Sequence, residues 1–217
     1  SFTDLYAVSE NFLQYHREIV FSTKYNNTVS VEQQNSPLTM GGKGLTNPTQ
    51  NLADAFGMAN GKGINEPGSG YDEDHPYVGR DPRFYMTFAY DGSEFTVNDK
   101  TQTIETFEGG KDATATNKTA TKTGYYLKKL LSPQAVWDGR TNNITRTWIL
   151  MRYAEVLLNY AEAMNEYCES PSQAPNDSIY KVVELIRKRA ELSPYKLPAG
   201  LTKEEMREVI RNERRVE

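Results

Sequence analysis

A long helix with a wide apolar face constrains the fold of this chain more than any other feature of its sequence. Apolar side chains recur at steps of three and four residues, namely at Leu150, Tyr153, Ala154, Leu157, Leu158, Ala161 and Met164. This spacing predicts an α-helix. Because the apolar arc covers well over half of the circumference, the helix must contact neighbours on more than one side. The sequence therefore predicts a helix inside a bundle or solenoid.

Two more helices are predicted after this one. The apolar face of the first is formed by Ile179, Val182, Val183, Ile186 and Ala190. Either Asn176 or Asp177 is its expected N-cap. Thr202 and Glu205 then form a capping box that begins the last helix. That helix has little of its own to pack against and no glycine or asparagine C-cap, so we expect the sequence to be a piece of a longer protein.

The middle of the chain, from Asn35 to about Thr147, has frequent glycines and prolines and only short apolar runs, which is typical of loops. Within it, residues 51–56 predict a short helix. Residues 112–124 form a polar tract with too little apolar surface to pack, and we expect it to be mobile. Before it, residues 3–14 predict an amphipathic helix, followed by an extended stretch at 18–21.

A β-hairpin is also predicted in this middle region. The aromatic and β-branched run at 83–90 predicts a strand, Asp91-Gly92 a turn, and residues 94–97 a return strand.

Composition excludes several classes of protein. The 217-residue chain has 25 basic and 29 acidic residues, a net charge of -4, and no basic cluster, so nucleic acid is not an expected partner. The single cysteine, Cys168, cannot form an internal disulfide or a redox pair, and we expect a packed thiol. No stretch approaches the length of a transmembrane helix. The start of the chain has no secretory pattern, so either the protein is cytoplasmic or an export signal has been removed.

Several stretches resemble motifs of one protein family. Residues 152–166, RYAEVLLNYAEAMNE, are similar to a helix of SusD/RagB-like proteins, and IRKRA at 186–190 and IRNERR at 210–215 are similar to the two helices after it. Further matches lie upstream: EIVF at 18–21, NPTQNLADAF at 47–56, RDPRF at 80–84 and GYYLKK at 124–129. The matches occur in the family's order and reach from end to end.

The resemblance implies a mainly α fold: a tetratricopeptide-like helical superhelix scaffold with a loop-rich insertion that contains short β-hairpins. We accordingly divide the chain into the end of an N-terminal helical part (1–34), a loop-rich variable insertion (35–147) and the helical scaffold (148–217). The resemblance also implies a non-catalytic, outer-membrane cell-surface lipoprotein without cofactors. Such a protein captures oligosaccharide or polysaccharide for a SusC-like TonB-dependent transporter. The family's signal, anchor cysteine and early helix pairs are not present in these residues.

The polar residues of the 150–166 helix have two interpretations. They form a narrow stripe of Arg152, Glu155, Asn159, Glu162 and Glu166. Carboxylates one or two turns apart can converge on a proton or a metal ion. Alternatively, they form ion pairs with the arginines of the following helices, Arg187, Arg189, Arg211, Arg214 and Arg215. We favour the structural interpretation, because buried or half-buried charges require partners, and predict no catalytic residues.

No metal or nucleophilic site is predicted elsewhere. The acidic stretch YDEDH at 71–75 could hold a hard cation, but it lacks the glycine and closing glutamate of an EF-hand, so a solvated loop is the favoured interpretation. The two histidines, His16 and His75, lie far apart, and no serine-nucleophile or phosphate-loop motif accompanies them.

Aromatic residues of the insertion are the candidates for binding glycan. A sugar ring presents an apolar C–H face and a rim of hydroxyls, which suits a flat aromatic ring beside polar side chains. The candidate ligand contacts are Tyr71, Tyr77, Arg80, Trp137 and Asn142. The alternative is that each ring packs on the helical core, which is the commoner place for an aromatic residue.

Three functions remain open from the sequence. The first is glycan capture without catalysis. The second is a protein-interaction scaffold that only docks the transporter, since tetratricopeptide-like helix pairs form concave binding surfaces. The third is a glycoside hydrolase, which needs two carboxylates about 5–9.5 Å apart, and no pair of acids stands out for that role.

Overall fold

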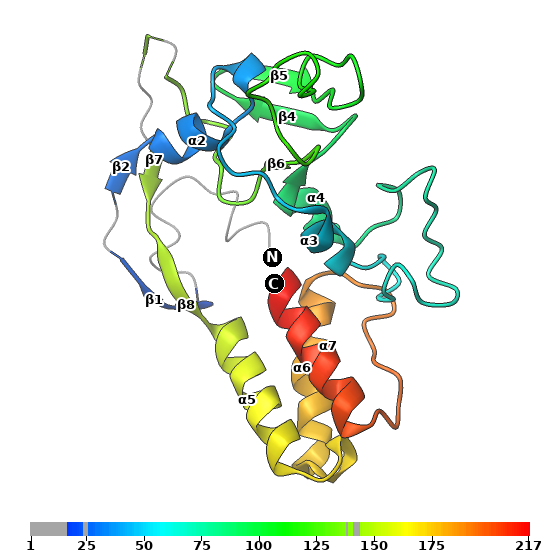
Figure 1. Cartoon of the computed structure of the whole chain (residues 1–217). Helices are drawn as coiled ribbons and strands as arrows, with labels where there is room; N and C mark the ends of the chain where they lie inside the picture. Colours follow the sequence, from blue (N-terminus) through cyan, green and yellow to red (C-terminus); the bar gives the residue numbers. More distant parts are fainter. Residues whose placement is uncertain (1–16, 24–25, 138, 141–143) are drawn as a thin grey trace.

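The computed structural model describes residues 17–23, 26–137, 139–140 and 144–217. Figure 1 shows three long helices side by side at one end of the molecule, and most of the short helices, two-stranded sheets and loops toward the other. The long helices are α5 (Tyr153–Tyr167), α6 (Ser178–Arg189) and α7 (Lys203–Val216). The short helices are α2 (Ser30–Asn35), η2 (Leu38–Met40), α3 (Gln50–Ala55), α4 (Pro82–Thr87), η3 (Pro171–Gln173) and η4 (Pro175–Asp177).

The strands are short and pair two by two. They are β1 (Ile19–Ser22), β2 (Asn26–Thr28), β3 (Phe88–Ala89), β4 (Glu94–Val97), β5 (Lys100–Thr103), β6 (Tyr126–Leu127), β7 (Ile144–Arg146) and β8 (Ile149–Arg152). All four pairs, β1–β8, β2–β7, β3–β6 and β4–β5, are antiparallel. The prediction of a mainly α fold with short hairpins in a loop-rich region is confirmed. The helix predicted at 3–14 lies outside the described residues.

The wide apolar face of α5 is explained by its two neighbours. α5 packs against both α6 and α7, and its buried residues Ala154, Leu158 and Ala161 join one core cluster with Ile186 of α6 and Ile210 of α7. The predicted contact on more than one side is confirmed. Cys168, which follows α5, is a buried free thiol, as expected.

The starts of α6 and α7 differ. At α7 the Thr202 side chain accepts a hydrogen bond from the Glu205 amide, and the Glu205 carboxylate accepts one from the Thr202 amide, which completes the predicted capping box. At α6 the prediction of a side-chain N-cap is wrong. Asp177 occupies the N-cap position in a left-handed conformation, with φ of 53°, and its side chain makes no capping bond.

The predicted strand at 83–90 is wrong over most of its length. Residues Pro82–Thr87 form α4, because the Asp81 side chain accepts a hydrogen bond from the Arg83 amide and Pro82 occupies the first helical turn. The hairpin instead joins β4 to β5. Its turn residues, Asn98 and Asp99, have φ of 57° and 56°, as a two-residue hairpin turn requires.

The polar tract at 112–124 packs better than its composition suggests. Ala113 and Ala120 are buried, and the buried carboxylate of Asp112 accepts hydrogen bonds from the Thr39 hydroxyl and the Glu105 amide. The expectation that this tract cannot pack is therefore wrong.

A network of buried and partly buried charges joins the three long helices to the rest of the chain. We call the following residues the charge junction: Glu18, Asp81, Arg83, Arg152, Arg187, Arg189, Glu213 and Glu217. At its centre Arg83 Nη2 lies 2.7 Å from Asp81 Oδ2, and Nη1 lies 2.6 Å from Glu213 Oε1. Burial alone would lower the pKa of Arg83, but Glu213, Asp81 and Glu217 raise it, so the guanidinium stays charged.

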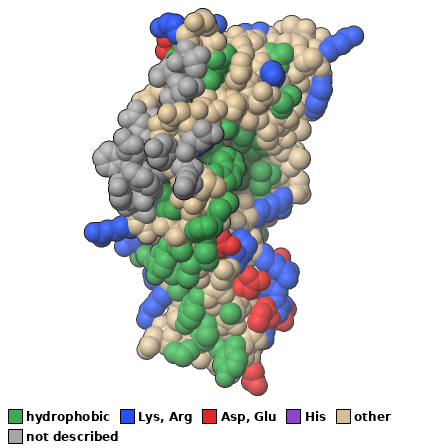
Figure 2. Space-filling view, turned by 90° about the vertical axis from the view of Figure 1, so that its left-hand side faces the viewer, with side chains coloured by type: hydrophobic (Ala, Val, Ile, Leu, Met, Phe, Trp, Pro, Cys, Tyr) green, Lys and Arg blue, Asp and Glu red, His purple; other side chains and the backbone are tan. Residues whose placement is uncertain are grey.

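One side of the molecule carries a band of exposed apolar residues. Figure 2 shows apolar side chains gathered along this side. The apolar band consists of Val20 and Phe21 of β1, Trp148, Leu150 of β8, and Tyr153, Tyr160 and Tyr167 of α5. None of the helices that the structure describes is both long and apolar enough to cross a membrane.

Candidate functional site

Arg80 organises the loops of the insertion from a buried position. Its guanidinium donates hydrogen bonds to the carbonyl oxygens of Ala53 (2.6 Å), Phe56 (2.6 Å) and Pro76 (2.8 Å). The side chain thereby ties the end of α3 to the loop that precedes α4. Since its N–H groups are directed to backbone oxygens, Arg80 fixes the positions of its neighbours. A direct contact with ligand stays a prediction.

Two of the predicted aromatic residues lie beside Arg80. The Arg80 guanidinium carbon is 5.4 Å from the centre of the Tyr71 ring and 4.5 Å from that of Phe84. Tyr77 stacks on Phe84. The two ring centres are 6.2 Å apart, and the angle between the ring planes is 26°. Tyr71, Tyr77 and Arg80 are thus brought together by one aromatic cluster.

The other two predicted residues are not part of this group. Trp137 is half-buried against a different core, and its Nε1 donates a hydrogen bond to the Gly41 carbonyl oxygen at 3.1 Å. Its backbone amide donates to Asn98 Oδ1 at 2.8 Å. Asn142 lies outside the described residues. A glycan contact by either residue stays a prediction.

A pocket of about 570 Å³ opens where three loops meet beside Tyr77. This loop pocket is lined by Asp74, His75, Pro76, Tyr77, Val78, Asp91, Thr106, Phe107 and Gly124. It therefore contains one of the predicted residues and part of the acidic stretch at 71–75. Phe107 and Asp91 were not predicted, because they lie 30 and 14 residues from Tyr77 in the sequence and no periodic pattern connects them.

An exposed aromatic ring and several hydrogen-bonding groups share the loop pocket. Phe107 is 56% exposed. Its position is fixed by Asp91, whose Oδ1 accepts hydrogen bonds from the amides of Thr106 (2.7 Å) and Phe107 (3.1 Å). Burial raises the pKa of Tyr77, and the nearby Tyr125 and Asp91 raise it further, so its hydroxyl remains a donor at neutral pH.

The acidic stretch at the mouth of the loop pocket is solvated, as the favoured interpretation expects. Asp72 Oδ2 lies 2.8 Å from His75 Nδ1, and both side chains are more than half exposed. Hydrogen bonds from the His75 side chain and the Asp74 amide lower the pKa of Asp72. Among the residues that the structure describes, no group of three or more His, Cys, Asp and Glu side chains is arranged to hold a metal ion.

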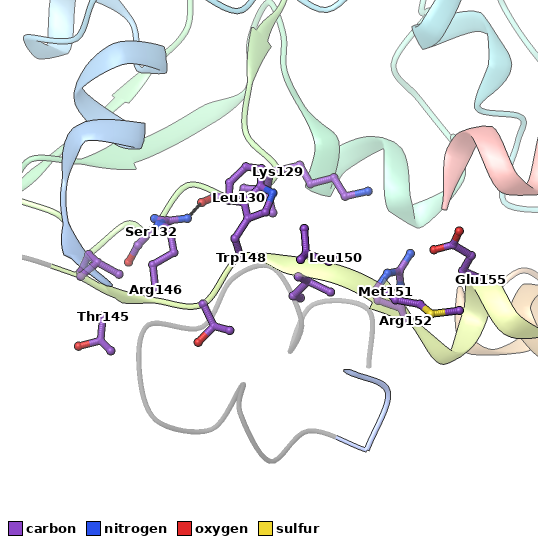
Figure 3. A pocket seen from close by; sticks show the side chains of 13 residues that line it. Lys129, Leu130, Ser132, Thr145, Arg146, Trp148, Leu150, Met151, Arg152 and Glu155 are labelled. Carbon is purple, nitrogen blue, oxygen red and sulfur yellow. Dashed lines mark hydrogen bonds between the residues drawn. The ribbon is translucent and has the colours of Figure 1, made fainter. Parts of the chain in front are cut away.

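A second pocket, of about 290 Å³, lies along β7 and β8 (Figure 3). This strand pocket is lined by Lys129, Leu130, Ser132, the continuous run 144–152, and Glu155. Trp148, which is 47% exposed, lies in the middle of the run. Trp148 was not predicted as a site residue, because residues from 148 onward were assigned to the helical scaffold. The helix predicted from Leu150 in fact begins at Tyr153, and residues 149–152 form β8. Its environment depends on the pairing of β1 with β8, which places Thr23 Oγ1 3.1 Å from the Trp148 amide.

The acids of the α5 stripe are paired with arginines of α7. Glu166 accepts two hydrogen bonds from Arg207, at 2.6 and 2.8 Å, and Glu162 Oε2 lies 3.0 Å from Arg214 Nη2. The structural interpretation is confirmed for Glu162 with the predicted partner Arg214, while Glu166 is paired with Arg207, which was not among the predicted arginines.

Comparisons with known proteins agree with the motifs. The family model described as the SusD family matches residues 12–217. The chain belongs to the SusD family. No curated protein matches the chain.

Two solved structures of SusD-like proteins share the fold of this SusD-family chain. One, a SusD-like protein from Bacteroides fragilis, is 27% identical, with a TM-score of 0.72, and the match covers 96% of this chain and 42% of that one. The other, described as a SusD-like carbohydrate binding protein from the same species, is 23% identical, with a TM-score of 0.67 and coverage of 98% and 42%. The chain therefore spans less than half of the length of either protein.

Six of the seven SusD-like motifs, all except that at 47–56, meet at the charge junction. Glu18 comes from the motif at 18–21, Arg83 from 80–84 and Arg152 from 152–166, while Arg189 and Glu213 come from the two helical motifs that follow. Lys129 of the motif at 124–129 reaches the same place, where its Nζ donates to the Glu217 carbonyl oxygen at 2.9 Å. The motifs by which the SusD family is recognised thus hold the structure together, and the two pockets lie beside them.

Proposed function

We propose that this chain binds glycan at the loop pocket and does not change it covalently. The observation that carries the proposal is the exposed Phe107 ring, held by Asp91 over a pocket whose wall includes Tyr77 and Asp74. An exposed ring can cover the C–H face of a sugar, while the hydroxyl and the carboxylates bond its rim. The description of one structural neighbour as a carbohydrate binding protein agrees with this function.

A binding role without catalysis agrees with the hydrogen bonds and ion pairs that the carboxylates make. A glycosidase needs one acid to donate a proton and a second to act as base or nucleophile. The α5 acids Glu162 and Glu166 are bonded to arginines, and Asp91 Oδ1 is occupied by two backbone amides. The hydrogen bonds from Arg207 lower the pKa of Glu166, which favours an ionised, structural carboxylate there.

Delivery of the captured glycan to a SusC-like outer-membrane transporter is the second part of the proposal. In this role the protein is a cell-surface lipoprotein. The apolar band along β1, β8 and α5 favours contact with another protein surface, because exposed apolar patches of this kind commonly mark protein interfaces.

We predict that Phe107→Ala weakens glycan binding about tenfold while leaving the fold intact. The change removes a mostly exposed ring, so affinity is lost through the missing sugar contact and the core is unaffected. A glycan array identifies a ligand for the purified chain, and calorimetry then compares the variants. Tyr77→Phe, which removes one hydroxyl, should weaken binding by a smaller factor.

Tyr167→Ala is the matched control, because Tyr167 is 86% exposed on α5, away from the loop pocket. It should bind glycan as the unmodified chain does. Unchanged affinity in both Phe107→Ala and Tyr77→Phe would remove the loop pocket from the proposal. The appearance of new reducing ends after incubation with the same oligosaccharide would contradict the non-catalytic role.

A further inference from the structure

The strand pocket combines an exposed aromatic ring with an excess of basic side chains. Trp148 and Leu150 are 47% and 51% exposed. Three basic residues, Lys129, Arg146 and Arg152, line the pocket, and Glu155 is the one carboxylate among its described lining residues. The loop pocket has the opposite character, since its charged lining consists of two aspartates and a histidine.

The basic residues of the strand pocket are held in place by the protein. Arg146 is bonded to the buried Glu32 carboxylate and to the Leu130 carbonyl oxygen. Arg152 Nη1 lies 2.9 Å from Glu217 Oε1 in the charge junction. These contacts fix the guanidinium groups before a ligand binds, so little side-chain conformational entropy would be lost on binding.

Lys129 is surrounded by charges from several elements. Burial lowers its pKa to about 8, and the guanidinium groups of Arg152 (β8), Arg83 (α4) and Arg189 (α6) act in the same direction. Glu217, after α7, acts in the opposite direction. Since the positive neighbours outweigh the negative one, an anion placed beside Lys129 would stabilise its protonated form.

We propose that the strand pocket is a second binding site, which takes a carboxylate-bearing sugar ring, a hexuronate, with Trp148 against the ring and Lys129 beside the carboxylate. Figure 3 shows Trp148, Leu130 and Lys129 close together on one side of the pocket, with Lys129 extending toward Arg152. An aromatic face suits the C–H surface of the sugar, and an ammonium group suits the acid. The volume of about 290 Å³ is at the lower end for small-ligand sites, so it suits a terminal ring more than a long segment.

The test compares α-1,4-linked digalacturonate with neutral α-1,4-linked galactobiose by calorimetry on the purified chain. We expect digalacturonate to bind at least tenfold tighter than galactobiose at pH 7. Lys129→Met should remove this preference, and Trp148→Ala should weaken digalacturonate binding by about tenfold. Lys111→Met, which removes a lysine that pairs with Glu105 at the loop-rich end of the molecule, should leave the affinity for digalacturonate unchanged.

The pH dependence separates a direct contact from a structural role of Lys129. With a pKa of about 8, Lys129 is about 90% protonated at pH 7 and about 10% protonated at pH 9, so affinity for digalacturonate should fall up to tenfold across this range. Lys129→Arg should retain binding and lose the pH dependence. Measurements near pH 8 in two buffers of different ionisation enthalpy should show proton uptake on binding.

Equal affinity for the acidic and neutral disaccharides, or an unchanged preference in a folded Lys129→Met variant, would overturn the proposal. So would affinity that does not vary between pH 7 and pH 9. Because the two pockets share no lining residue, failure here leaves the proposed glycan function untouched, and failure of the loop pocket leaves this site standing.

Discussion

Replacing Arg83 with alanine is expected to lower the free energy of unfolding by about 3–5 kcal/mol, because it leaves buried acids without their counter-charge. The Arg83 side chain is 1% exposed and is bonded to Asp81, Glu213 and Glu217, whose side chains are at most 4% exposed. A loss of this size is a large fraction of the stability of an ordinary domain. Chemical denaturation followed by circular dichroism measures it.

Two further variants identify the cause of that loss. Arg211→Ala removes an arginine whose partner, Glu208, is exposed like itself, and it should change stability by no more than about 0.5 kcal/mol. Arg83→Met combined with Glu213→Gln should be more stable than Arg83→Met alone, since the second change removes an orphaned acid. A double variant no more stable than the single one would show that packing, and not charge, makes Arg83 important.

The charge junction also explains why the family could be recognised from the sequence while the pockets could not. Five of the seven motifs supply a charged residue whose partner lies in another motif, for example Arg83 with Glu213, which is 130 residues away. These residues are recognisable one motif at a time. The pockets are formed by segments that meet only after folding, loops in one case and strands in the other, so neither the exposure of Phe107 nor that of Trp148 follows from its local sequence.

Local sequence signals were sufficient to predict an element where the interacting residues belong to the same turn of the chain. The capping box of Thr202 and Glu205 predicted the start of α7 correctly, because both partners belong to the same turn. The same reasoning would have placed α4, since Asp81 and Pro82 are a helix-start pair. That signal was overridden by the aromatic residues at 84–90, which favour strands in general but here bury their rings from a short helix.

Replacing Phe84 with alanine is expected to lower the free energy of unfolding by about 3–5 kcal/mol, the usual cost of removing a buried aromatic ring. Phe84 is fully buried, and its ring centre lies 4.9 Å from that of Phe88 and 6.2 Å from those of Phe56 and Tyr77. Its face also covers the Arg80 guanidinium at 4.5 Å. Chemical denaturation should show the loss.

Phe84→Ala should also lower the affinity of the loop pocket for glycan, because the aromatic cluster connects Phe84 to Tyr77. Because Tyr77 stacks on Phe84, the cavity left by Phe84→Ala allows the Tyr77 ring to shift, and glycan affinity should fall together with stability. Phe84→Leu refills most of the space and should restore much of both. Phe107→Ala serves as the comparison. Its free energy of unfolding should change by no more than about 0.5 kcal/mol, while its affinity for glycan falls. A folded Phe84→Ala protein with full stability would show that this cluster does not support the loops, and the positioning of Tyr77 would then require another explanation.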